Sequence, residues 1–86
     1  MMAERDADVH DRITALVQRE HELRERLATE VDPGERSTER AELRDLEVAL
    51  DVCWDLLRQR DARRAAGEDP DEAVARPSGE VEGYLQ

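Results

Sequence analysis

Apolar residues recur at intervals of three and four along two long stretches of this chain, and a short polar break separates the stretches. Such spacing places the apolar side chains on one face of an α-helix. It therefore predicts one helix over about residues 5–30 and a second over about residues 33–66. The apolar positions are Val9, Ile13, Leu16, Leu23 and Leu27 in the first stretch, and Leu43, Leu46, Leu50, Cys53 and Leu57 in the second.

The break contains the residue types that end one helix and begin the next. Asp32 can serve as an N-cap, Pro33 fits the first helical position, and the Glu35 carboxylate can reach back to the cap residue. Because a short connection between long helices favours antiparallel packing, we predict an all-α, coiled-coil-like helical hairpin over residues 1–67. Gly67 is the predicted end of the second helix, since glycine adopts the left-handed conformation at little cost.

Charges at the two ends of the chain agree with this antiparallel arrangement. Folding back would bring acids at the start of the first helix near an arginine cluster at the end of the second. The acids are Asp6, Asp8 and Asp11, and the cluster runs from Arg58 to Arg64. Exposed ion pairs contribute only about 0.2–1 kcal/mol each, so the apolar seam must dominate the stability.

The hairpin is followed by an acidic tail over residues 68–86. Asp69 and Pro70 repeat the pattern of a cap followed by proline, which predicts a short helical turn over about residues 70–75. We expect the rest of the tail to be extended.

The second helix carries another apolar line, formed by Val48, Val52 and Leu56, away from its main stripe. At about 100° per residue these side chains share a face that a two-helix hairpin leaves uncovered. Another copy of the chain, the C-terminal tail or a partner protein must cover it, and the sequence leaves these possibilities open. The candidate interaction residues are Val48, Val52, Leu56, Trp54 beside the main stripe, and Tyr84 and Leu85 at the end of the tail.

The composition excludes several classes of function. Charged residues make up 42% of the chain and the net charge is −10, so direct binding to nucleic-acid phosphates is not expected. No stretch approaches the ~20 apolar residues of a membrane span, and the acidic N-terminus does not resemble a secretory signal. Cys53 is the single cysteine, which excludes an intrachain disulfide and fits a reducing cytoplasm.

Residues that carry catalysis do not stand at recognisable spacings, so we expect no enzyme activity and assign no catalytic, cofactor or metal residues. Glu20 leaves one alternative open, because it falls within the apolar stripe of the first helix, where an unpaired charge is costly. Either an arginine or the open centre of a dimer satisfies it, or the carboxylate belongs to a metal site. Such a small metal-binding or redox bundle would use Glu20 with Glu47, His21 or Cys53.

A second alternative concerns the turn, where Glu30, Asp32 and Glu35 form an acidic tip. Its shape is analogous to the coiled-coil fingers with which some transcription factors enter the secondary channel of RNA polymerase. A regulator of transcription that contacts RNA polymerase or a sigma factor is therefore an alternative function.

Two stretches of the chain carry a family resemblance. The first runs from His21 to Leu27, and the second from Leu46 to Arg60 with a Cys-Trp-Asp-Leu-Leu-Arg core. Together with the Gly-Tyr-Leu sequence near the end of the chain, they resemble a family of short actinobacterial proteins known only as a domain of unknown function. The resemblance implies a small cytoplasmic helical protein. It brings no activity and no functional residues.

These features together predict an interaction module rather than an enzyme. The favoured hypothesis is a helical hairpin that self-associates through its second helix, as a homodimer or four-helix bundle, or that docks on another protein.

Overall fold

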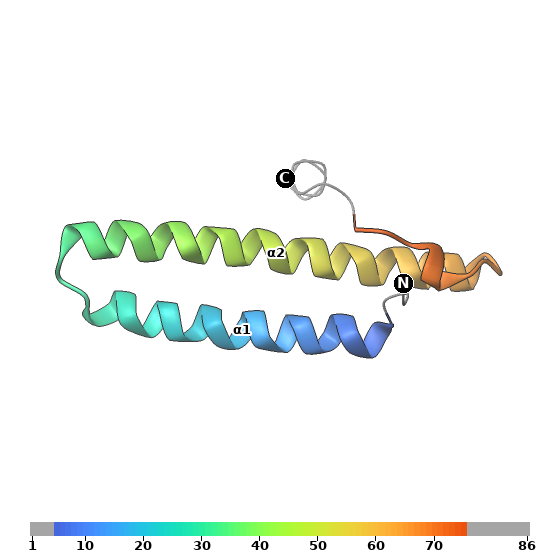
Figure 1. Ribbon diagram of the computed structural model, residues 1–86, viewed down its shortest axis with the longest axis horizontal. Coiled ribbons are helices and arrows are strands. Elements are labelled where there is room, and N and C mark those ends of the chain that lie inside the picture. Colours follow the sequence, from blue (N-terminus) through green and yellow to red (C-terminus); the bar gives the residue numbers. More distant parts are fainter. Residues whose placement is uncertain (1–4, 76–86) are drawn as a thin grey trace.

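The structure is a computed structural model that describes residues 5–75, which form two long α-helices and one short 3-10 helix. Helix α1 spans Asp6–Thr29, α2 spans Pro33–Ala65, and the 3-10 helix η1 spans Pro70–Glu72. Figure 1 shows α1 and α2 side by side, running in opposite directions. The predicted all-α hairpin with two long helices is confirmed, and residues 5–75 contain no strand. Tyr84 and Leu85 lie outside the described residues.

The turn between the helices is fixed by hydrogen bonds to its acidic residues. The Asp32 carboxylate accepts a hydrogen bond from the N–H of Glu35 at 2.9 Å, as an N-cap should. The reverse bond predicted from the cap residue to the Glu35 carboxylate is replaced by another. The N–H of Asp32 donates instead to Oε1 of Glu30 at 2.9 Å. Glu30 precedes the cap by two residues, which lets its side chain reach this N–H.

Arg36 joins the end of α1 to the first turn of α2. Its Nη1 atom donates to the carbonyl oxygen of Leu27 at 2.7 Å and to that of Glu30 at 2.9 Å. The last carbonyl groups of a helix have no partner within the helix, and a cation also interacts favourably with the helix dipole there. This arginine therefore stabilises the C-terminal end of α1 across the turn.

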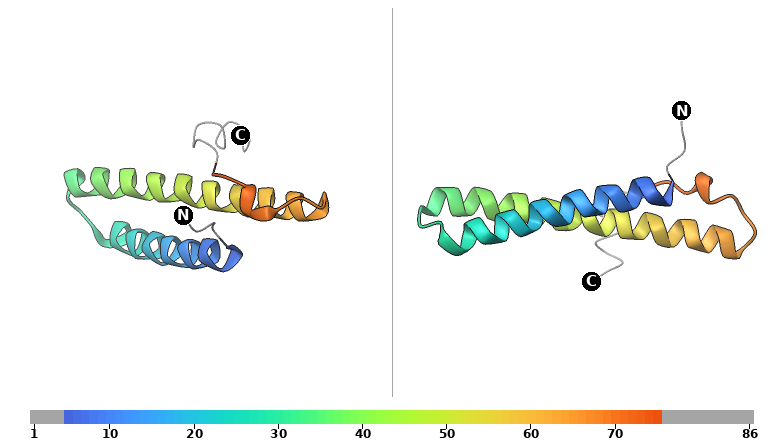
Figure 2. Two further views of the ribbon diagram at one scale, coloured as in Figure 1. Left: turned by 45° about the vertical axis from the view of Figure 1, so that its right-hand side comes forward. Right: turned by 90° about the horizontal axis from the view of Figure 1, so that it is seen from below.

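Gly67 ends α2 by adopting the left-handed conformation, with a φ angle of 75°. The N–H of Glu68 donates to the carbonyl of Arg63 at 2.8 Å, and the N–H of Gly67 donates to that of Arg64 at 3.1 Å. These two bonds form a Schellman motif, which satisfies carbonyl groups that the end of the helix leaves open. The chain then reverses, and residues 68–75 return alongside α2 (Figure 2).

The core is a narrow apolar seam between the helices near the open end of the hairpin. Leu16 of α1 and Ala73 of the returning segment pack against it while remaining partly exposed. Leu23, closer to the turn, is also fully buried, with 0% of its surface exposed. The buried members of the core cluster are Val9, Ile13, Leu50, Cys53, Leu56 and Leu57, of which Leu56 belongs to the outer line of α2.

Ion pairs flank the seam between the helices. The Nη2 atom of Arg19 lies 2.9 Å from the Glu42 carboxylate, and the Nη2 atom of Arg24 lies 3.0 Å from the Glu47 carboxylate. These side chains are partly exposed, so each pair contributes only about 0.2–1 kcal/mol. Neither helix of the described part has an apolar stretch long enough to cross a membrane.

The first prediction concerns the seam. Leu23→Ala removes a fully buried side chain and leaves a cavity, so it should lower the free energy of unfolding by about 2–5 kcal/mol. Thermal unfolding followed by circular dichroism measures this loss. Val31→Ala is the control, because Val31 is 88% exposed and should tolerate truncation. Equal stability of the two variants would contradict the proposed dependence on the seam.

Candidate functional site

Arg60 is a buried cation near the end of α2, with only 4% of its surface exposed. Its Nε atom donates to Oδ1 of Asp6 at the start of α1. Its Nη2 atom lies 3.0 Å from the Asp71 carboxylate, and its Nη1 atom donates to the carbonyl of Pro70 at 3.2 Å. A buried charge is tolerated only when it is paired and hydrogen-bonded. Arg60, Asp6 and Asp71 therefore form a clamp, here called the arginine clamp, that holds α1, α2 and η1 together.

Two neighbouring arginines extend the clamp toward the surface. An Nη2 atom of Arg64 pairs with the second carboxylate oxygen of Asp6. Arg63 lies 3.3 Å from the carboxylate of Glu68 and 3.6 Å from that of Glu72. Asp6 thus lies near this arginine cluster, as the antiparallel arrangement predicted, and acids of the segment after α2 contribute to the same ion pairs.

The apolar line on the outer side of α2 is not open along its whole length. Val48 and Val52 are partly buried, whereas Leu56 is 2% exposed and belongs to the core. Ala73, from the segment after α2, packs against that core cluster. Of the three possible covers considered from the sequence, the chain's own C-terminal segment thus lies against the cluster that contains Leu56.

Polar contacts hold this segment in place beside Leu56. Gln59 donates from Nε2 to the carbonyl of Val74 at 3.0 Å and to the carboxylate of Asp55 at 2.9 Å. Asp55 is buried although it projects away from the seam, which shows that this side of α2 is covered. A role for Val48, Val52 and Leu56 in contacts between molecules stays a prediction.

Trp54 lies on the other side of α2 and remains accessible, with 44% of its surface exposed. The imidazole ring of His10 meets it edge-on, with 6.3 Å between the ring centroids and an angle of 81° between the planes. Val17 is also 46% exposed. It lies seven residues after His10, about two helical turns, and therefore on the same side of α1. We call Trp54, His10 and Val17 the tryptophan surface.

Glu20 lies beside an arginine, which is one of the alternatives that the sequence left open. Arg24 lies 3.4 Å from the Glu20 carboxylate and 3.0 Å from the Glu47 carboxylate, so one guanidinium group joins the two proposed metal ligands. His21 instead contacts Glu25 at 3.1 Å, and Cys53 is buried in the core. Within residues 5–75, His, Cys, Asp and Glu side chains form no group of three or more that could hold a metal ion.

The acidic tip is organised as a network that serves the turn. The N–H of Asp32 lowers the pKa of Glu30 by donating a hydrogen bond to its carboxylate. The nearby Glu30 carboxylate raises the pKa of Glu35, chiefly through the hydrogen bond between the two side chains. Asp32 caps α2. All three acids of the tip therefore have a local structural role.

The second prediction concerns the arginine clamp and acid. The hydrogen bond from Arg60, followed by that from Arg64, holds the pKa of Asp6 below its ordinary value of 3.8. The folded state therefore binds this proton less readily than the unfolded state. The resulting stabilisation is fully present above the ordinary pKa of 3.8, which the unfolded state keeps. It is lost as the pH falls through the lowered pKa of Asp6 in the folded state.

Asp6→Asn should accordingly be less stable than the wild type at neutral pH and should lose less stability on acidification. Urea unfolding between pH 7 and pH 2 measures both effects. Asp11→Asn is the matched control, since Asp11 is an exposed acid of the same helix and has no ion pair among the described residues. Parallel acid profiles for Asp6→Asn and the wild type would contradict the role of the clamp.

Comparison with known proteins finds a matching family model and related proteins. The family model described as "Protein of unknown function (DUF2630)" matches residues 5–86. Uncharacterized proteins of Mycobacterium bovis and of two Mycobacterium tuberculosis strains are each 60% identical over 48 residues, which is 56% of this chain and 55% of each relative. The matched stretch thus spans about half the length of these relatives. No solved structure matches the chain significantly. Because the family model covers nearly the whole chain, the protein belongs to the DUF2630 family of unknown function.

Proposed function

We propose that this protein acts by contact, without catalysis, as a protein–protein interaction module centred on the tryptophan surface. The observation that carries the proposal is the exposure of Trp54, 44% of whose surface is open to water. Tryptophan is enriched among the residues that dominate binding energies, because its ring buries a large apolar area on contact. A partner that covers Trp54 would gain the binding free energy of burying this apolar area, which remains exposed in the folded hairpin.

The neighbours of Trp54 suit it to this role. The edge-on contact with His10 restricts the indole ring before any partner arrives. A side chain that is already ordered loses less conformational entropy on binding. Val17 adds a second exposed apolar side chain on the same side of α1. The tryptophan surface therefore offers a small, pre-ordered apolar anchor on a charged hairpin.

The occupant we propose is a second protein with a basic surface. The chain carries a net charge of −10, so a basic partner is attracted over a distance, while a second copy is repelled. The segment after α2 also packs against the core cluster that contains Leu56. Among the three covers that the sequence left open for the outer line of α2, that packing favours the chain's own segment over a second copy. Self-association is the alternative that an experiment must separate from this proposal.

The third prediction tests the tryptophan surface. Proteins captured from an actinobacterial lysate are identified, and the affinity of a basic candidate is measured against the wild type and Trp54→Ala. Truncating a central tryptophan should weaken binding at least about tenfold, as expected for a binding hot spot. Because Trp54 is the single tryptophan, its fluorescence should also shift to shorter wavelength when a partner without tryptophan binds.

Val31→Ala is the matched control, because it truncates an apolar side chain that is more exposed but lies at the turn. Sedimentation of the isolated protein decides the alternative. A monomer whose partner binding depends on Trp54 supports the proposal. A stable homodimer that Val52→Glu dissociates and Trp54→Ala leaves intact would contradict it, as would partner binding that survives Trp54→Ala.

A further inference from the structure

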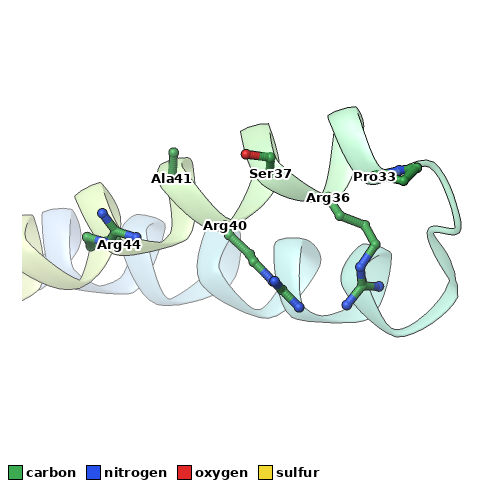
Figure 3. A pocket seen from close by; sticks show the side chains of 6 residues that line it. All are labelled: Pro33, Arg36, Ser37, Arg40, Ala41 and Arg44. Atoms are coloured by element: carbon green, nitrogen blue, oxygen red, sulfur yellow. The ribbon is translucent and has the colours of Figure 1, made fainter.

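A hollow of about 550 Å³ lies along the first half of α2, at the turn end of the hairpin. It is distant from the tryptophan surface in sequence and does not enter the function proposed above. Figure 3 shows the guanidinium groups of Arg36 and Arg40 extending from α2 in the same direction. The lining residues are Pro33, Arg36, Ser37, Arg40, Ala41 and Arg44, and none of them is acidic.

Carboxylates balance the positive charge of this hollow only in part, because Glu30 lies near Arg36. Arg40 and Arg44 form no ion pair with any of residues 5–75. The Nη1 atom of Arg36 donates hydrogen bonds to two backbone carbonyls at the end of α1, and these bonds order its guanidinium group. Five other arginines of the hairpin behave differently. Arg19, Arg24, Arg60, Arg63 and Arg64 each lie within ion-pair distance of a carboxylate.

The spacing of these arginines has an energetic cost for the isolated chain. Arg36, Arg40 and Arg44 follow one another at intervals of four residues, so they are neighbours on the helix surface. Like charges at that spacing destabilise a helix, whereas a Glu at any of these positions would stabilise it. Acids are abundant in this chain, with 23 Asp and Glu against 13 Arg. A row of three arginines is therefore unexpected in so acidic a chain, because arginine and glutamate in alternation at these positions would stabilise the helix more.

We propose that this hollow binds a small phosphate-bearing anion through Arg36, Arg40 and Arg44. The planar guanidinium group presents donors in a fork that matches phosphate oxygens, and an anion bound beside this row reduces the repulsion between its like charges. In Figure 3 the Ser37 side chain points away from the Arg36 and Arg40 guanidinium groups, so the donors proposed for the anion are the arginines. No aromatic side chain lines the hollow, so recognition rests on the phosphate and not on stacking of a base.

The fourth prediction tests this assignment with inorganic phosphate as the probe. Titration of the isotope-labelled protein, followed by nuclear magnetic resonance, should give saturable shifts confined to residues 33–44. In the double variant Arg40→Gln and Arg44→Gln the affinity should fall at least about tenfold, as expected for the loss of one charge-assisted hydrogen bond. Replacement of both arginines by lysine should give an intermediate affinity, because the charge is kept and the fork is lost.

Arg58→Gln is the matched control, since Arg58 is an exposed arginine of α2 outside the hollow and should leave phosphate binding unchanged. The glutamine double variant should unfold at the same or a slightly higher temperature than the wild type, because a repulsion has been removed. A clear fall in its unfolding temperature would mean that the arginines serve the fold, and would count against the proposal.

Two further arms identify the source of the phosphate. Sedimentation with phosphatidylglycerol vesicles, but not with phosphatidylcholine vesicles, would assign it to a lipid headgroup if the same arginines are needed. Absence of that binding, with inorganic phosphate still bound, would assign it to a soluble anion. Shifts that do not saturate, shifts that persist in the glutamine variant, or binding of a glutamate-rich peptide without binding of phosphate would each overturn the proposal.

Discussion

The burial of Arg60 constrains this structure more than any other single interaction. A guanidinium group with 4% of its surface exposed would be strongly destabilising if either partner were absent. Its partners come from both sides in the sequence, because Asp6 begins α1 and Asp71 lies in η1 beyond the end of α2. The folded state therefore requires α1, α2 and η1 in place at the same time, and the direction of the segment after α2 follows from that requirement.

That direction decides which side of α2 is left for contact. Once Asp71 is bound to Arg60, Ala73 packs against the core cluster and Val74 reaches the Gln59 side chain. The side of α2 that carries Leu56 is thereby covered within one chain. The side that carries Trp54 receives only the edge of the His10 ring and stays open. An ion pair at one end of the hairpin thus determines the accessible apolar surface.

Much of the fold could be predicted from the sequence, because it depends on local patterns. The periodic apolar residues predict both helices, and the Asp32 cap and Gly67 predict where α2 begins and ends. The arginine clamp could be predicted only in part, because the antiparallel arrangement brings Asp6 near Arg60, whereas the pairing of Arg60 with Asp71 depends on the return of η1. Which of the three possible covers lies against Leu56 could not be predicted for the same reason. Glu30 took the place predicted for Glu35 because two nearby carboxylates compete for one N–H, and helical periodicity does not rank them.

Residues on the candidate surfaces are harder to recognise, because the signals for contact and for solvation overlap. Trp54 could be placed beside the seam from its position, but the sequence did not decide between burial and exposure. The arginine row carries a signal in the sequence, namely like charges repeated at intervals of four against a mainly acidic background. That signal gains meaning only when the structure shows that no carboxylate from α1 reaches Arg40 or Arg44.

The two proposed surfaces share α2, through Arg44 and Trp54, yet should act independently. Arg44 and Trp54 are ten residues apart, which corresponds to about 15 Å along a straight helix. Charges in water are largely screened beyond about 8 Å at physiological ionic strength, so an anion in the hollow would barely alter the field at Trp54. Coupling between the two surfaces would require a conformational change in α2. A ligand on either surface would nevertheless stabilise the same folded hairpin. At a hundredfold excess over its dissociation constant, such a ligand adds about 2.7 kcal/mol, a large gain for a domain with so narrow a core.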